Sequence, residues 1–257
     1  MDRSSRLGEE KCNNQGCLMR IVEYNKAIDI TVEFQDEHKA KVHTNYNAFI
    51  KGMVENPYYT SVYGVGIRGN KYPTKINGNM TKEYRAWFQM IRRCFNKTEK
   101  ERRPAYQNVA CCDEWLSYEN FYEWLHSQEN FDKWLNGDKW AIDKDILVKG
   151  NKTYSPEVCC LVPQNVNVLF TKHDAARGDC PIGVIRHRDR FAARCMNPFI
   201  GKQITLGYRL TQSSAFDVYK SYKEKIIKQV ARNEYLNGNI TKSCYEAMMS
   251  YVVENDD

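Results

Sequence analysis

The sequence predicts an α+β protein, and three patterns in separate parts of the chain carry this prediction. Apolar residues alternate with polar ones from Leu18 to Val42, which is the period of half-buried strands. A strand, a turn, a second strand and a short helix are predicted between 141 and 171, and three short strands followed by a long helix are predicted after Pro181. Antiparallel sheets with helices packed against them are therefore expected.

The first module, residues 1–78, is expected to be a small antiparallel sheet over Met19 to Val42, with a turn at Gln35–Glu37. A short helix is predicted near Tyr46 to Lys51, and the stretch from Gly64 to Gly78 is typical of a loop-rich linker. The role of this module is left open.

The second module, residues 79–172, begins with helices. Thr81 is suited to cap a helix that runs to about Phe95, and a second helix is predicted over Ser117 to Glu129. Both helices carry aromatic residues at core spacing, which we interpret as packing rather than as base-stacking platforms. Three arginines lie beside the apolar stripe of the first helix: Arg85, Arg92 and Arg93.

The rest of this module is predicted to be a strand over Ala141 to Val148, a turn, a strand over Val158 to Val162, and a short helix that starts at Pro163. On the first of these strands, Asp143 and Asp145 are expected to share one face, because strand side chains alternate.

The third module, residues 173–257, is predicted to hold strands over Ile182–His187, Arg190–Cys195 and Gln203–Tyr208. Thr211 is suited to cap the long helix that follows, and a last helix is predicted from Thr241 to about Val253.

Charge is unevenly distributed along a chain of 257 residues with net charge +6. From Thr81 to Arg103 eight basic residues face three acidic ones (+5), and from Thr171 to Arg232 thirteen face five (+8). Between them, Cys111 to Asp145 has three basic and nine acidic residues (−6). This pattern suits a polyanion bound at two places, and solvated helix faces are the alternative.

Hydropathy and cysteine usage indicate the compartment. We find no apolar run long enough for a bilayer and no signal-peptide core at the N-terminus, so a membrane or secretory location is not expected. The ten cysteines are then expected to be reduced thiols in a cytoplasmic protein.

Two segments carry a resemblance to known families. Trp140–Leu147, Gly150–Glu157 and Val162–Asn167 together resemble the ββα-metal finger of phage HNH homing endonucleases. Downstream, Pro181–Val184, Arg190–Ala193 and Leu206–Tyr208 resemble the plant ethylene-response (APETALA-type) DNA-binding domain, which such endonucleases often carry. The resemblance implies a phage-encoded protein that acts on double-stranded DNA in the cytoplasm of a bacterial host.

Carried onto this chain, the finger motif implies that Asp143 and Asn167 bind a divalent cation, Mg²⁺ or Mn²⁺, that clamps the scissile phosphate. Lys144 stands where the family has its general-base histidine, and Val158 stands where it has the orienting asparagine. A protonated lysine would stabilise charge on the phosphate, so Asp145 is the alternative base or ligand. The alternative is that both aspartates are surface carboxylates without a metal.

Cysteines near the finger suggest a structural zinc site, since some ββα-metal nucleases carry one. Cys94, Cys112 and Cys159 with a fourth ligand would form it, although no CxxC pair is present and buried thiols are favoured.

The APETALA-type resemblance implies that DNA is read from the outward face of the three-stranded sheet. Matching positions are Ile185, His187, Arg194, Gln203 and Thr205, with Arg186, Arg188 and Arg190 as phosphate contacts. Arg85, Arg92 and Arg93 are further DNA-binding candidates. A sheet that only packs against a partner is the alternative.

The leading hypothesis is a sequence-specific DNA-binding protein that nicks or cleaves DNA with a bound metal. Loss of the base and its orienter favours a second hypothesis, a catalytically silent relative that acts as a DNA-binding regulator. A third hypothesis is a phage inhibitor that binds a host defence protein.

Overall fold

The computed structural model describes residues 6–171 and 179–255 and contains both helices and strands, which confirms the α+β class. The chain divides into two compact units, Met1–Trp124 and Leu125–Asp257. The expected modules 1–78, 79–172 and 173–257 stay a prediction, and the unit boundary falls inside the second of them.

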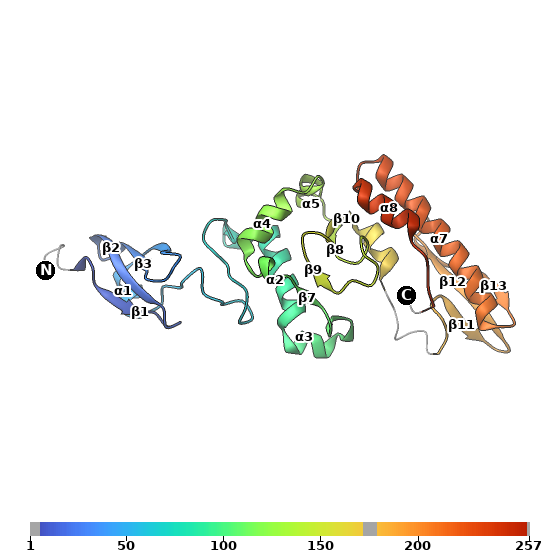
Figure 1. Ribbon diagram of the computed structural model, residues 1–257, viewed down its shortest axis with the longest axis horizontal. Helices are drawn as coiled ribbons and strands as arrows, with labels where there is room; N and C mark the ends of the chain where they lie inside the picture. The colour runs from blue at the N-terminus through green and yellow to red at the C-terminus, as the bar shows by residue number, and fades with distance from the viewer. Residues whose placement is uncertain (1–5, 172–178, 256–257) are drawn as a thin grey trace. The chain divides into compact units, whose positions relative to one another are not determined.

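The first unit begins with a four-stranded antiparallel sheet in the order β1-β2-β3-β4 (Figure 1). Its strands are β1 (Glu10–Cys12), β2 (Leu18–Lys26), β3 (Asp29–Phe34) and β4 (Lys41–Thr44). The alternation in β3 buries Ile30, Val32 and Phe34 against Phe49 of helix α1 (Tyr46–Ile50). The predicted sheet and short helix are therefore confirmed, with β1 as an additional strand.

The remainder of the first unit consists of a long segment of loops and turns followed by several helices. After the hairpin β5 (Lys75–Ile76) and β6 (Asn79–Met80) come α2 (Lys82–Phe95), α3 (Lys97–Arg102), η2 (Pro104–Tyr106), β7 (Ala110–Cys111), η3 (Asp113–Leu116) and α4 (Tyr118–His126). Trp87, Trp115 and Tyr118 are fully buried, and Trp87 Nε1 donates to the carbonyl of Trp115 at 2.8 Å. These aromatics form a core, as the helical spacing predicts.

The second unit opens with α5 (Phe131–Asn136), followed by β8 (Trp140–Asp143), β9 (Thr153–Tyr154), β10 (Cys160–Pro163), α6 (Gln164–Asn167) and η4 (Val168–Phe170). β8 and β10 are antiparallel, with Asp143 opposite Cys160 and Trp140 opposite Pro163. The strand–strand–helix order agrees with the prediction, but β8 ends at Asp143 rather than at Val148. The prediction that Asp145 shares a strand face with Asp143 is therefore wrong.

The C-terminal part consists of β11 (Val184–His187), β12 (Arg190–Asn197) and β13 (Lys202–Arg209) in one antiparallel sheet, then α7 (Gln212–Leu236) and α8 (Lys242–Ser250). Figure 1 shows α7 lying along this sheet with α8 beside it. Thr211 Oγ1 accepts from the Ser214 backbone N–H at 3.2 Å, so the predicted cap is confirmed.

One hydrophobic core joins the two parts of the second unit. Val162 and Val166 of the β10–α6 segment belong to the same buried cluster as Val184 and Ala193 of the sheet and Ile227 of α7. The β8–β10 pair and the C-terminal sheet are thus held in a single unit, which positions the residues described next.

Candidate functional site

The register of the C-terminal sheet decides which side chains face away from α7. Val184, Ala193 and Cys195 belong to the core formed with α7. The other set of cross-strand neighbours is Ile185 with Ala192, Ala192 with Tyr208, His187 with Arg190, Arg194 with Thr205, and Met196 with Gln203. Directly opposed residues in antiparallel strands project to the same side. We call this second set the outward face: Ile185, His187, Arg190, Ala192, Arg194, Met196, Gln203, Thr205 and Tyr208.

The outward face holds all five of the positions that the sequence suggested for base contacts. These five positions combine hydrogen-bonding side chains (His187, Arg194, Gln203, Thr205) with one apolar residue, Ile185. Most of them are exposed or half-exposed, while Ala192 at the centre is covered by its neighbours. The face can therefore offer donors and acceptors to a ligand that lies flat against it.

The three arginines expected at phosphates are placed differently. Arg190 lies on the outward face beside His187. Arg186 lies opposite Phe191, and its guanidinium is 5.2 Å from the Phe191 ring centroid, so it projects from the other side of the sheet. Arg188 lies in the exposed β11–β12 turn with φ +56°. Only Arg190 therefore shares the face with the base-contact positions.

Tyr208 and Met196 lie on the outward face although the sequence did not single them out. Because strand side chains alternate, a regular strand with Gln203 and Thr205 outward would also have Gly207 outward and would turn Tyr208 to the other side. The register shifts between Ala193 and Arg194, because Ala193 pairs with Gly207 whereas Arg194 pairs with Thr205. This bulge turns Tyr208 outward, where its ring lies 5.1 Å from that of His187. Met196, in contrast, follows the alternation and could have been found from it.

The arginines of α2 belong to the first unit, and two of them have internal partners. Arg92 Nη2 forms an ion pair with Glu99, which also pairs with Arg103 at 3.3 Å. The guanidinium of Arg93 lies 5.7 Å from the ring centroid of Tyr106. Arg85 is exposed. The contacts of Arg92 indicate a structural role in joining α2 to α3.

The Arg92–Glu99 pair should make stability depend on pH. The hydrogen bond from Arg92 lowers the pKa of Glu99 from its ordinary value of 4.5. The contribution of the Arg92–Glu99 pair to the free energy of unfolding is therefore present above pH 4.5. It is lost as the pH falls through the lower pKa that Glu99 has in the folded state. We expect the difference in thermal unfolding midpoint between wild type and Glu99→Gln to shrink between neutral and acidic pH. A constant difference would contradict this assignment.

Strand β8 ends at Asp143, where the chain turns and the following backbone N–H groups donate to the Asp143 carboxylate. Oδ1 accepts from the backbone N–H groups of Asp145 at 2.7 Å and Ile146 at 2.9 Å. The residue is only 8% exposed. Burial raises the pKa of Asp143, and these two backbone hydrogen bonds oppose the rise. The carboxylate thus acts as the acceptor that closes a turn.

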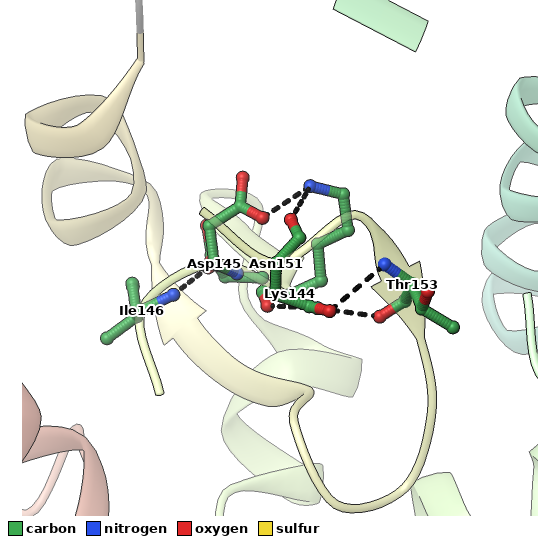
Figure 2. A network of polar contacts seen from close by, with 6 residues as sticks. Lys144, Asp145, Ile146, Asn151 and Thr153 are labelled. Carbon is green, nitrogen blue, oxygen red and sulfur yellow. Dashed lines mark hydrogen bonds and ion pairs between the residues drawn. The ribbon is translucent and has the colours of Figure 1, made fainter. Parts of the chain in front are cut away.

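Lys144 and Asn151 complete the polar network of the β8–β9 loop, which Figure 2 shows from close by. Lys144 Nζ pairs with the Asp145 carboxylate and donates to the Asn151 carbonyl at 3.2 Å. Asn151 Nδ2 donates to the carbonyls of Lys144 at 2.8 Å and Thr153 at 2.7 Å, and Asn151 Oδ1 accepts from the Thr153 N–H at 3.1 Å. The loop is therefore cross-linked by its own side chains.

The contacts of the β8–β9 loop use some of the oxygens that were expected to bind Mg²⁺ or Mn²⁺. Such cations need several oxygen ligands with accessible lone pairs. Asp143 Oδ1 already accepts two backbone hydrogen bonds, and Asp145 is neutralised by Lys144. Asn167, the second expected ligand, ends α6 and would supply a neutral amide oxygen. Two of the oxygens expected to bind the cation, Asp143 Oδ1 and Asp145 Oδ1, are therefore already engaged by groups of the protein.

The cysteines expected at zinc lie in different units, Cys94 and Cys112 in the first and Cys159 in the second. Within residues 6–171 and 179–255, no cluster of three or more His, Cys, Asp or Glu side chains is arranged to hold a metal ion. The neighbouring Cys244 thiol and burial raise the pKa of Cys160 well above its ordinary value. These buried thiols contribute to the core.

The chain matches no protein-family model, no curated protein and no solved structure in the comparisons made. In the part of the chain that the structure describes, no helix has both the length and the apolar character needed to cross a membrane.

Proposed function

We propose that the chain binds double-stranded DNA through the outward face of the β11–β13 sheet. The observation that carries the proposal is the sheet register, which gathers His187, Arg190, Arg194, Gln203 and Thr205 on one side. Strands can read base edges in the major groove, where arginine and glutamine suit guanine and adenine.

Charge supports the same ligand. The segment from Thr171 to Arg232 carries thirteen basic and five acidic residues, and positively charged surfaces attract the phosphate backbone. Arg190 lies on the outward face, and Arg188 lies in the exposed turn at the same end of the sheet. In the proposed complex these two cations contact phosphates while the centre of the face meets the bases.

The test is duplex binding measured by fluorescence anisotropy over a series of salt concentrations. We expect Arg190→Ala to weaken binding about tenfold at low salt and to reduce the slope of log K against log salt by about 1, because one phosphate contact is lost. Arg232→Ala is the matched control, since Arg232 is exposed on α7 in the same unit. Equal losses in both variants would mean that net charge, not this face, holds the DNA.

Absence of any duplex binding at low salt would overturn the proposal. It would leave the inhibitor hypothesis, in which the chain binds a host defence protein stoichiometrically and without a cation.

We propose that the segment from β8 to α6, which resembles the ββα-metal finger, does not cleave DNA. Asp143 is committed to closing a turn, and Lys144 is held by Asp145 and Asn151. The Lys144 ammonium group donates to oxygens of these two residues and presents no acceptor to a water molecule, so it is not placed to act as a base. Metal-dependent cleavage stays the competing hypothesis.

A supercoiled-plasmid nicking assay separates the two roles. We expect neither wild type nor Asp143→Asn to nick plasmid faster with Mn²⁺ than without it, on DNA that both bind. Asparagine is chosen because it keeps the Oδ1 acceptor and so the fold of the loop. Mn²⁺-dependent nicking by wild type that disappears in Asp143→Asn would establish a nuclease instead.

A further inference from the structure

The second unit contains a cavity of about 580 Å³ beside the C-terminal sheet. β11 pairs only with the first half of β12, up to Ala193, whereas β12 continues to Asn197. The edge of β12 beyond Arg194 is therefore left open on that side, and the cavity lies around this edge. Its volume is in the range of sites that enclose small organic molecules.

Most of the cavity wall is apolar. Among its apolar residues are Phe170 after α6, Val184 at the start of β11, Tyr219 on α7, and Tyr251 with Val253 after α8. Because these side chains also belong to, or pack against, the main core, the wall is supported from behind. A preformed apolar wall favours a ligand with an apolar body.

Two cationic side chains, Arg194 and Lys223, also line the cavity, together with the amide of Gln203. Arg194 Nε is buried, and within the described part of the chain it has no hydrogen-bond partner. An unpaired buried guanidinium N–H costs free energy until an acceptor reaches it. Burial raises the pKa of the Cys195 thiol in the same wall, and the positive charge of Lys223 opposes that rise. The ammonium group of Lys223 is therefore close to this wall of the cavity.

We propose that this cavity binds a small organic anion, with its anionic group at Arg194 and its apolar body against Phe170, Val184 and Tyr219. An anionic oxygen is the acceptor that a guanidinium N–H binds most strongly, and a second cation beside it favours charge over a neutral polar group. Arg194 and Gln203 also belong to the outward face, so this proposal and the DNA proposal share two residues, and the experiments below measure anion binding in the absence of DNA.

The first experiment compares two probes that differ only in the head group. Isothermal titration calorimetry of the full chain with octanoate and with 1-octanol should show one octanoate site and at least tenfold weaker binding of the alcohol. Equal affinities would overturn the anionic character of the site. Absence of saturable octanoate binding would overturn the site itself.

The second experiment tests Arg194. Arg194→Gln should weaken octanoate binding at least tenfold, because the charge is removed, whereas Arg190→Gln on the same strand should leave it unchanged, since Arg190 does not line the cavity. Unchanged binding by Arg194→Gln would contradict the proposal.

A measurement on the wild type covers the case in which Arg194→Gln does not fold. Octanoate should shift the backbone amide NMR signals of Val184, Cys195 and Tyr219 in the wild-type chain. Shifts confined to other parts of the chain would place the ligand elsewhere and overturn the proposal.

Discussion

Gly183→Ala should destabilise the second unit by about 3 kcal/mol. Gly183 has φ +73°, and a Cβ added there would overlap the ring of Tyr219 on α7, closer than side chains ever pack. The turn before β11 is therefore pressed against α7, and the sheet would have to move away from the helix to admit a methyl group. Urea unfolding followed by tryptophan fluorescence and far-UV circular dichroism measures the loss.

Gly201→Ala is the matched control for this effect. Gly201 has φ +64° in the β12–β13 turn, but a Cβ added there meets nothing within 4 Å. Only the backbone cost of about 1 kcal/mol is then expected. Similar losses in the two variants would show that backbone conformation, and not the contact with Tyr219, dominates at Gly183.

Asp143→Ala should destabilise the same unit by about 2 to 3 kcal/mol. The substitution leaves the backbone N–H groups of Asp145 and Ile146 without their acceptor, and Ile146 is buried, so water cannot fully replace it. Chemical denaturation of wild type and variant, under conditions free of divalent cations, measures this loss.

Asp143→Asn separates a structural carboxylate from a metal ligand. Asparagine keeps an oxygen at Oδ1, so we expect a loss of about 1 kcal/mol or less. If Asp143 instead served chiefly to bind Mg²⁺ or Mn²⁺, both variants would be as stable as wild type without the cation. That result would contradict the turn-closing role.

Helix starts are the features that the sequence predicted most closely. Thr81, Thr211 and Thr241 each precede a helix, and each Oγ1 accepts from a backbone N–H three residues later, at 3.1, 3.2 and 3.3 Å. This interaction lies within one turn of chain, so local sequence is sufficient to specify it.

Strand ends were predicted less well. The run from Ala141 to Val148 alternates suitably for a strand, but β8 stops at Asp143. The reason is a competing local contact, in which a buried aspartate accepts from two following N–H groups and turns the chain. Whether an aspartate does this depends on its burial, which is decided by the packing around it.

The sequence by itself determined the α+β class and the helix caps, and its resemblance to the APETALA-type domain suggested Ile185, His187, Arg194, Gln203 and Thr205, which lie on one face of the sheet. The tertiary structure decided where β8 ends, that Tyr208 turns outward at a bulge, and that Arg194 Nε is buried beside a cavity. Caps and alternation follow from neighbouring residues. Register shifts and burial depend on partners distant along the chain, as between β12 and β13 or between Gly183 and Tyr219, and a local pattern does not encode them.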